Sequence, residues 1–320
     1  MFYYFLFYAK IILGDKMKKN LLLIILGLIL LVVYLCKEDL VVFYVENFVK
    51  VDKDIKLSSN NIYTNPNDFS YVFETNNFIP SNKQDLKNIY YTILNSGVNE
   101  FTFYCPTDGT YDNCINDVKF LASDQSSLSH INNFVHPFNG FKHIETEYDS
   151  LGKITISVEK TYSEEKIKIV ENEVNKILKK EILSSDSIEE KIKKVHDYII
   201  NNSKYDSNRS DDNIVNYDSD TAYGTLIEGY GLCGGYTDSM ALFLTSLGIK
   251  NYKVASENHV WNALYLNDTW YHLDLTWDDP VTTDLKDVLE YNFFLITTNE
   301  LKELKTDQHN FDINVYKELK

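Results

Sequence analysis

Apolar residues recur at helical spacing in some parts of the chain and alternate in others. Helical spacing predicts helices over about 81–97, 163–182 and 187–201, the last with a capping box formed by Ser187 and Glu190. Ser81 and Gln84 have the same capping spacing, and Gly97 marks that helix's end. Residues 99–105 alternate like a strand, and two further strands flank a turn at 149–152. We therefore predict an α+β protein with a boundary near residue 185.

The pattern after residue 220 predicts two helices. Asp220 is placed to cap the first, which the glycines at 229 and 231 end. The second starts after Cys233 and stops at Gly248. Its buried stripe is Tyr236, Met240, Leu244 and Leu247.

Residues 258–280 follow, and they predict two strands joined by a tight turn at Asn267 and Asp268. With that two-residue turn, Trp261 lies opposite Asp274, and His259 lies on the same face of the hairpin. His259 and Asp274 then become diagonal neighbours within side-chain reach, whereas a slip of one residue would send them to opposite faces.

The N-terminal pattern is a basic segment followed by an unbroken apolar run, Leu21 to Cys36. This order is typical of an export signal, and the lysines before the run are expected to stay inside. No A-x-A-like cleavage site follows, so residues 1–36 predict an uncleaved membrane anchor. The alternative is a cleaved signal and a secreted protein. Met17 is a second candidate for the true start.

Composition and charge narrow the classes of partner. A hydrophobic content of 44% with 24% charged residues is typical of a globular protein. The net charge of −16 argues against a nucleic-acid partner, because nothing would neutralise the phosphates. An anionic lipid surface would also repel the chain, so membrane association must come from insertion. A cationic partner fits this charge better.

Two groups of residues outside the hairpin carry candidate chemistry. If the chain is exported, it meets an oxidising environment, and Cys105 and Cys114 are near enough in sequence to form a disulfide. The alternative is two reduced thiols. Residues 205–220 carry five aspartates but lack the glycine and terminal glutamate of an EF-hand loop. A solvated surface loop is therefore a better interpretation than a cation site.

Cys233 lies in the segment GYGLCGGYTDSM, among glycines and at a predicted helix start. A helix N-terminus favours the thiolate over the thiol, and its free N–H groups can stabilise an oxyanion. The alternative is a small buried cysteine in a core helix. A nucleophile also needs a base and an orienting group, and both His259 and His272 share a face with Asp274. The spacing does not choose between the two histidines.

Three blocks, GYGLCGGYTDSMALFLTSLGI, NHVWNALYL and WYHLDLTWDD, resemble the bacterial branch of the transglutaminase-like superfamily. The segment HDYIINNSKYD resembles the helix that precedes this core. The resemblance covers about residues 185–280 and implies a papain-like fold with Cys233, His259 and Asp274 as a catalytic triad. Gly234 stands where many relatives have Gln or Glu, which affects any inference about the site entrance and the substrate.

The resemblance implies acyl transfer at amide or peptide carbonyls, ending in hydrolysis or in a cross-link. The expected domains are the anchor (1–36), an α+β module of unknown role (37–184) and a transglutaminase-like domain (185–320). Tyr223 or Tyr230 is a candidate second oxyanion donor, and Trp261 either lines the acyl site or packs. We expect no cofactor and no metal, because Cys233, His259 and His272 lack paired ligand spacing. The expected substrate is a protein or peptide, with cell-wall peptide as one candidate. The rival function is a non-catalytic envelope module that binds such a partner.

Overall fold

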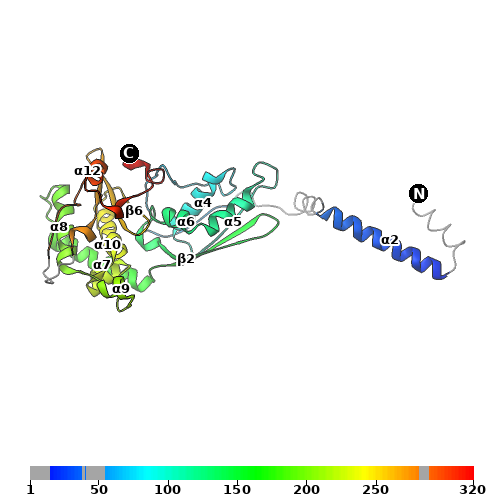
Figure 1. Cartoon of the computed structure of the whole chain (residues 1–320), viewed down its shortest axis with the longest axis horizontal. Coiled ribbons are helices and arrows are strands. Elements are labelled where there is room, and N and C mark those ends of the chain that lie inside the picture. Colours follow the sequence, from blue (N-terminus) through cyan, green and yellow to red (C-terminus); the bar gives the residue numbers. More distant parts are fainter. Residues whose placement is uncertain (1–14, 38–39, 41–54, 281–287) are drawn as a thin grey trace.

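The structure is a computed structural model that describes residues 15–37, 40, 55–280 and 288–320 (Figure 1). The alternative start at Met1 and the first part of the expected anchor lie outside these residues. Helix α2 spans Asp15–Leu35, and many of its apolar side chains are exposed. Across the residues that are described, no helix meets the length and apolarity that crossing a membrane requires. The predicted anchor is not supported by this finding and stays a prediction.

The N-terminal module has the predicted helix, strand and hairpin. Its antiparallel sheet has the order β1-β3-β2, and helices lie beside it. The elements are α4 (Lys83–Ser96), β1 (Glu100–Tyr104), α5 (Cys114–Ser123), α6 (Gln125–Asn132), a 3-10 turn η1 (Pro137–Asn139), β2 (Phe141–Tyr148) and β3 (Lys153–Lys160). The cap of α4 is Asn82 rather than Ser81, because the Asn82 side chain accepts from the N–H groups of Gln84 and Asp85. Gly97 ends this helix at φ +68°, as predicted.

A disulfide joins Cys105 to Cys114, with 5.7 Å between their Cα atoms. Both cysteines are buried in the core of this module, and the bond ties the end of β1 to the start of α5. Cys233 is a free thiol.

The remaining elements surround one central helix, α10 (Cys233–Ser246). Helices α7 (Glu164–Glu181) and α8 (Ile188–Asn202) start at Ser163 and Ser187 as predicted, the second with its capping box. Both contact α10, which packs on the antiparallel sheet β6-β7-β8 (Figure 1). The other elements are β4 (Lys204–Tyr205), α9 (Ser207–Asp212), a π-helical turn η2 (Gly224–Glu228), β5 (Tyr230–Gly231), β6 (Asn251–Ala255), β7 (Val260–Leu266), β8 (Thr269–Leu273), α11 (Leu275–Asp278), α12 (Thr298–Glu303) and the 3-10 turns η3 (Asp307–His309) and η4 (Lys317–Leu319).

Helix α10 is buried all round rather than along one stripe. Every residue from 235 to 244 is buried, because the sheet covers one face and the helices α7 and α8 cover another. The four-residue stripe predicted from the sequence was therefore too narrow. A helix enclosed in this way holds its first residue, Cys233, in a fixed place.

The β7–β8 hairpin has the predicted register. Asn267 and Asp268 form the turn with φ angles of 50° and 60°, and Leu266 pairs with Thr269. The pairing continues to Asn262 and Leu273, so Trp261 and Asp274 follow as the next opposed positions. The hydrophobic pattern and the turn residues were sufficient to fix this geometry.

The segment before Cys233 differs from the prediction in two ways. The Asp220 side chain forms an ion pair with Arg209 instead of capping a helix, and the following backbone makes a short π-helical turn. The loop at 205–220 is also more than a solvated loop, since it contains α9. Asp206 is buried and caps α9, and Asp218 pairs with Lys166.

Two buried clusters hold the molecule together, and each includes residues from both sides of position 185. The first combines Phe103 and Ile154 with Trp261 and Tyr316, and the second combines Tyr162 with residues of α8, α10 and β8. The boundary near 185 stays a prediction about chain organisation. Within the described residues, the packing is shared across it.

Candidate active site

Cys233 is the first residue of α10 and is half-buried. The preceding residue, Leu232, has extended backbone and donates its N–H to the Ser219 carbonyl at 2.7 Å. This bond holds the 218–221 loop against the start of the helix. The N–H groups of the first helical turn have no acceptor within the helix, so they are available to an anion beside Cys233.

Three glycines around Cys233 let that loop come close. A Cβ on Gly235 would lie 2.3 Å from the Ser219 carbonyl oxygen, and one on Gly231 would lie 2.6 Å from Thr225 Oγ1. A Cβ on Gly234 would lie 3.0 Å from the Asp220 carbonyl oxygen. The Gly234 position therefore faces the backbone of the loop, and it does not point into an open entrance.

His259 lies between a tight turn and strand β7. Its carbonyl accepts the Ser256 N–H at 2.9 Å, which closes the turn after β6. The ring is buried, and its Nε2–H donates to Asp274 Oδ2 at 2.5 Å. The Cys233 side chain lies close to this ring, and Nδ1 is the ring nitrogen that Asp274 leaves for it. Burial opposes the cation, but Asp274 and Cys233 outweigh it and raise the pKa of His259 to about 10.

Asp274 follows β8 and caps the short helix α11. Its Oδ1 accepts the N–H groups of Thr276 at 3.0 Å and Trp277 at 3.3 Å, while Oδ2 faces His259. Burial favours the neutral acid, but the two histidines that donate to Oδ2 outweigh it and lower the pKa of Asp274 to about 2. The carboxylate is therefore ionised at neutral pH and can stabilise an imidazolium at His259.

His272, the second histidine on this face, has hydrogen-bond partners different from those of His259. Its Nδ1 accepts the indole N–H of Trp261 at 2.9 Å, so its Nε2–H donates to Thr298 Oγ1 at 3.0 Å. Thr298 in turn donates to the Leu319 carbonyl. Burial lowers the pKa of His272 to about 3, and no lone pair on the ring remains for a base.

The secondary site candidates are Trp261, Tyr230 and Tyr223, and each ring has different neighbours. Trp261 is fully buried, and its indole stacks on the His259 ring at a centroid distance of 5.7 Å. It therefore supports His259 from behind and does not line an accessible acyl site. Tyr230 stacks on Tyr217, and Tyr223 lies under the Lys166 ammonium group. The ring contacts of these two tyrosines do not test a role as oxyanion donor, which stays a prediction.

Side-chain bonds between α10 and β7 keep Cys233 and His259 in register. Thr237 Oγ1 donates to the Val260 carbonyl at 3.0 Å, and Asn262 Nδ2 donates to the Thr237 carbonyl at 3.0 Å. Asn262 is the asparagine of the NHVWNALYL block. Its amide explains why an asparagine is suited to this strand position.

His309 is a site residue that sequence reasoning missed. Its Nε2–H donates to Asp274 Oδ2 at 2.8 Å, on the same oxygen that His259 uses. It comes from the turn η3, 35 residues after Asp274 in the chain. No periodicity or turn signal connects the two positions, and the resemblance to the superfamily ends near residue 280.

His259, Asp274 and His309 present three ligand atoms within 4.8 Å of one another, a grouping that could hold a metal ion. Two ligands of a tetrahedral zinc ion lie about 3.3 Å apart, given metal–ligand bonds of about 2.0–2.1 Å. The observed separations of 2.5 and 2.8 Å are instead those of N–H···O hydrogen bonds. The geometry therefore fits proton-bearing imidazoles better than metal ligands.

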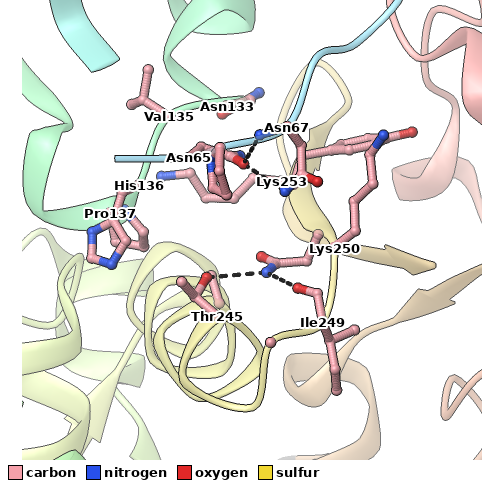
Figure 2. A pocket seen from close by; sticks show the side chains of 15 residues that line it. Asn65, Asn67, Asn133, Val135, His136, Pro137, Thr245, Ile249, Lys250 and Lys253 are labelled. Atoms are coloured by element: carbon pink, nitrogen blue, oxygen red, sulfur yellow. Dashed lines mark hydrogen bonds between the residues drawn. The ribbon is translucent and has the colours of Figure 1, made fainter. Parts of the chain in front are cut away.

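A polar cavity of about 170 Å³ lies at the other end of α10, between the N-terminal module and β6 (Figure 2). On its floor, Asn251 Nδ2 donates to Thr245 Oγ1 and to the Ile249 carbonyl. Thr245 lies about 18 Å along the helix from Cys233, at 1.5 Å per residue. This cavity is therefore separate from the triad.

The comparisons with known proteins show which family this part of the chain is similar to. Residues 175–275 match the family model of the transglutaminase-like superfamily, and the match includes Cys233, His259 and Asp274. Residues 175–275 form a transglutaminase-like domain. The predicted resemblance is thus confirmed over this part of the chain, and His309 lies beyond it.

Solved structures that are similar to part of the chain include one described as a TGase and one described as a candidate cysteine protease from Cytophaga hutchinsonii. The first is 16% identical with a TM-score of 0.33, over 43% of this chain and 44% of the other. The second is 14% identical with a TM-score of 0.26, over 42% of this chain and 61% of the other. No curated protein shows a significant match to the chain.

Proposed function

We propose that the transglutaminase-like domain is a cysteine-nucleophile enzyme that transfers acyl groups from amide or peptide carbonyls. One observation supports this most. The His259 ring bonds to Asp274 Oδ2 at 2.5 Å through Nε2, and the Cys233 side chain lies close to the same ring. A thiol, an imidazole and a carboxylate in this order are the components of a triad.

In the resting state His259 is an imidazolium beside the Cys233 sulfur, at a helix N-terminus of the kind that favours a thiolate. A pKa of about 10 keeps His259 protonated at neutral pH, and the Asp274 carboxylate balances its charge. The sulfur attacks the substrate carbonyl carbon, a C–S bond forms and the carbonyl oxygen becomes an oxyanion. The N–H groups of the first turn of α10 stabilise that oxyanion.

Collapse of the tetrahedral intermediate breaks the C–N bond, and His259 gives its proton to the departing amine. The thioester that remains on Cys233 is then attacked by a second nucleophile, which His259 deprotonates as it approaches. Water as the nucleophile gives hydrolysis, and an amine gives a cross-link. Either attack breaks the C–S bond and returns the thiolate and the imidazolium.

The substrate we propose is a protein or peptide outside the cytoplasm, with cell-wall peptide as one candidate. Helix α2 presents exposed apolar side chains after a basic segment, which supports attachment to the membrane through the N-terminus. Fractionation of cells, with protease added outside, tests this placement. Recovery of the protein in the soluble cytoplasmic fraction would contradict it.

The test of the function uses full-length protein, cell-wall peptides and a labelled primary amine, with products identified by mass. We expect release of ammonia or amine, with or without incorporation of the label, and loss of at least ~100-fold of this activity in Cys233→Ser and His259→Gln. His143→Gln, at an exposed position on β2, is the matched control. Binding of peptide without turnover in any sample would favour the non-catalytic envelope module instead.

A further inference from the structure

The Asp274 carboxylate has more partners than a triad requires. Its Oδ1 accepts two backbone N–H groups from α11, and its Oδ2 accepts one imidazole N–H from His259 and a second from His309. Four donors fill the usual acceptor capacity of a carboxylate. His309 supplies the one side-chain donor besides His259 that the described contacts give to this carboxylate.

The His309 ring is held rigidly. Its Nδ1 bonds Thr306 Oγ1 at 2.7 Å, so both ring nitrogens have partners, and 1% of the side chain is exposed. The ring stacks on Phe293 at a centroid distance of 4.9 Å and meets the edges of Trp261 and Trp277. Packing on three aromatic rings fixes the direction in which Nε2–H points.

The charged and titratable groups around His309 are few. His259 and Asp274 form the ion pair of the triad, and His272 is neutral because its Nδ1 accepts from Trp261. The other contacts that the described residues make with the His309 ring come from Phe293, Trp261 and Trp277 and from the Thr306 hydroxyl. The hydrogen bond from His309 therefore acts mainly on Asp274.

We propose that His309 is a positioning residue of this site, which holds the Asp274 carboxylate ionised and turned toward His259. The proposal rests on the proposed function, and it means that the segment after residue 288 completes the site. An ordinary buried histidine would need only to fill space among the aromatic rings. A positioning histidine must donate through Nε2.

Two substitutions separate these roles. His309→Phe keeps an aromatic ring against Phe293 but removes the donor. His309→Gln loses the ring but places an amide N–H near the position of Nε2. His143→Phe makes the same substitution at an exposed position on β2 and is the control.

The first measurement follows the carboxyl ¹³C signal of Asp274 against pH in the full-length protein, assigned with Asp274→Asn. It does not depend on catalysis. His309→Phe removes a donor that favours the charged form, so we expect the pKa of Asp274 to rise by about one unit or more, and His309→Gln to restore most of the difference. An unchanged midpoint in His309→Phe would overturn the proposal.

The second measurement is the rate at which iodoacetamide labels Cys233. Once Asp274 takes up a proton, His259 loses the charge that favours its cation. We therefore expect His309→Phe to lose about twofold in rate near pH 3, where a carboxyl whose pKa has risen from about 2 to about 3 is half protonated, and to change little near pH 8, with His309→Gln close to wild type. An equal loss at both pH values would indicate a packing role. If wild-type Cys233 is unreactive while the ¹³C midpoint still moves, the proposed function fails and the effect on Asp274 stands.

Discussion

His259 and His272 are both buried in the same hairpin, yet their partners drive them in opposite directions. His259 faces a carboxylate, which raises its pKa to about 10, while His272 faces the N–H group of Trp261, and burial lowers its pKa to about 3. A proton on His272 Nδ1 would point at the indole proton. The environment of each ring, and not its spacing from Asp274, decides which histidine can exchange protons.

This difference predicts how stability depends on pH. The folded-state pKa of His272 lies below its ordinary value of 6.5, so its contribution is present above pH 6.5 and is lost as pH falls toward about 3. His272→Asn keeps an acceptor for Trp261 but removes the titration. We expect about 1–3 kcal/mol lower stability at pH 7.5 and a shallower loss between pH 6.5 and 4, by up to 1.4 kcal/mol per pH unit.

Urea unfolding at several pH values measures this slope. His143→Asn, at an exposed position, should leave it unchanged. If His272→Asn loses stability on acidification as steeply as the wild type, His272 is not the buried neutral group that we describe.

At the residue scale, the sequence predicted part of the site. The two-residue turn at Asn267 and Asp268 places His259 and Asp274 on one face, so that pair follows from local rules. The choice of His259 over His272 does not follow, because it depends on Trp261 and Thr298. His309 could not be predicted either, because only tertiary folding brings η3 to the end of β8.

At the element scale, the start of α10 depends on how closely the 218–221 loop approaches it. A Cβ at position 235 would meet two backbone carbonyl oxygens and Thr225 Oγ1, the nearest at 2.3 Å, whereas at 234 it would meet one oxygen at 3.0 Å. An alanine at position 235 would require the loop backbone to move away. An alanine at position 234 would require that backbone to shift by only a few tenths of an ångström. The two glycines are therefore not equivalent.

We predict that Gly235→Ala destabilises the protein by about 2–3 kcal/mol and lowers the reactivity of Cys233, because the loop must move away from the helix N-terminus. Gly234→Ala should change stability by less than about 1 kcal/mol, since its strain is offset by the better helix propensity of alanine. Urea unfolding of the two variants side by side tests the difference. Equal stabilities would contradict the close approach.

Helices and turns were predicted correctly where short-range sequence signals determine them. They were predicted wrongly where tertiary packing determines the backbone conformation. The capping box at Ser187 and the turn at Asn267 are short-range signals, and both were confirmed. The turn after Asp220 was predicted as an ordinary helix, but it widens into a π-helical turn, with Asp220 paired to Arg209. That ion pair depends on α9, which the sequence pattern did not reveal.

At the scale of the whole molecule, the N-terminal module and the transglutaminase-like domain share a core. Tyr316 Oη accepts from Asn133 Nδ2 at 2.8 Å and from the Ala255 N–H at 2.9 Å, and the Lys253 N–H donates to the Asn133 carbonyl. Phe134 packs on Tyr252 at a centroid distance of 4.9 Å. These contacts join α6 to β6 and to the C-terminal segment.

We therefore predict that a fragment of residues 185–320 does not fold by itself, because Tyr252, Trp261 and Tyr316 would lose part of their packing. The full chain should unfold in one cooperative transition when followed by circular dichroism and by tryptophan fluorescence. A fragment with native-like fluorescence and a reactive Cys233 would show that the shared core is dispensable.

The most direct test of the triad is the rate of Cys233 alkylation by iodoacetamide between pH 4 and 9, in the wild type and in Asp274→Asn. We predict that wild-type Cys233 reacts at pH 5–6 faster than free cysteine, and that Asp274→Asn loses this acidic reactivity because the carboxylate that holds His259 as a cation is gone. A wild-type rate that rises only along the titration of free cysteine, centred at about pH 8.5, would contradict a thiolate–imidazolium pair at this site.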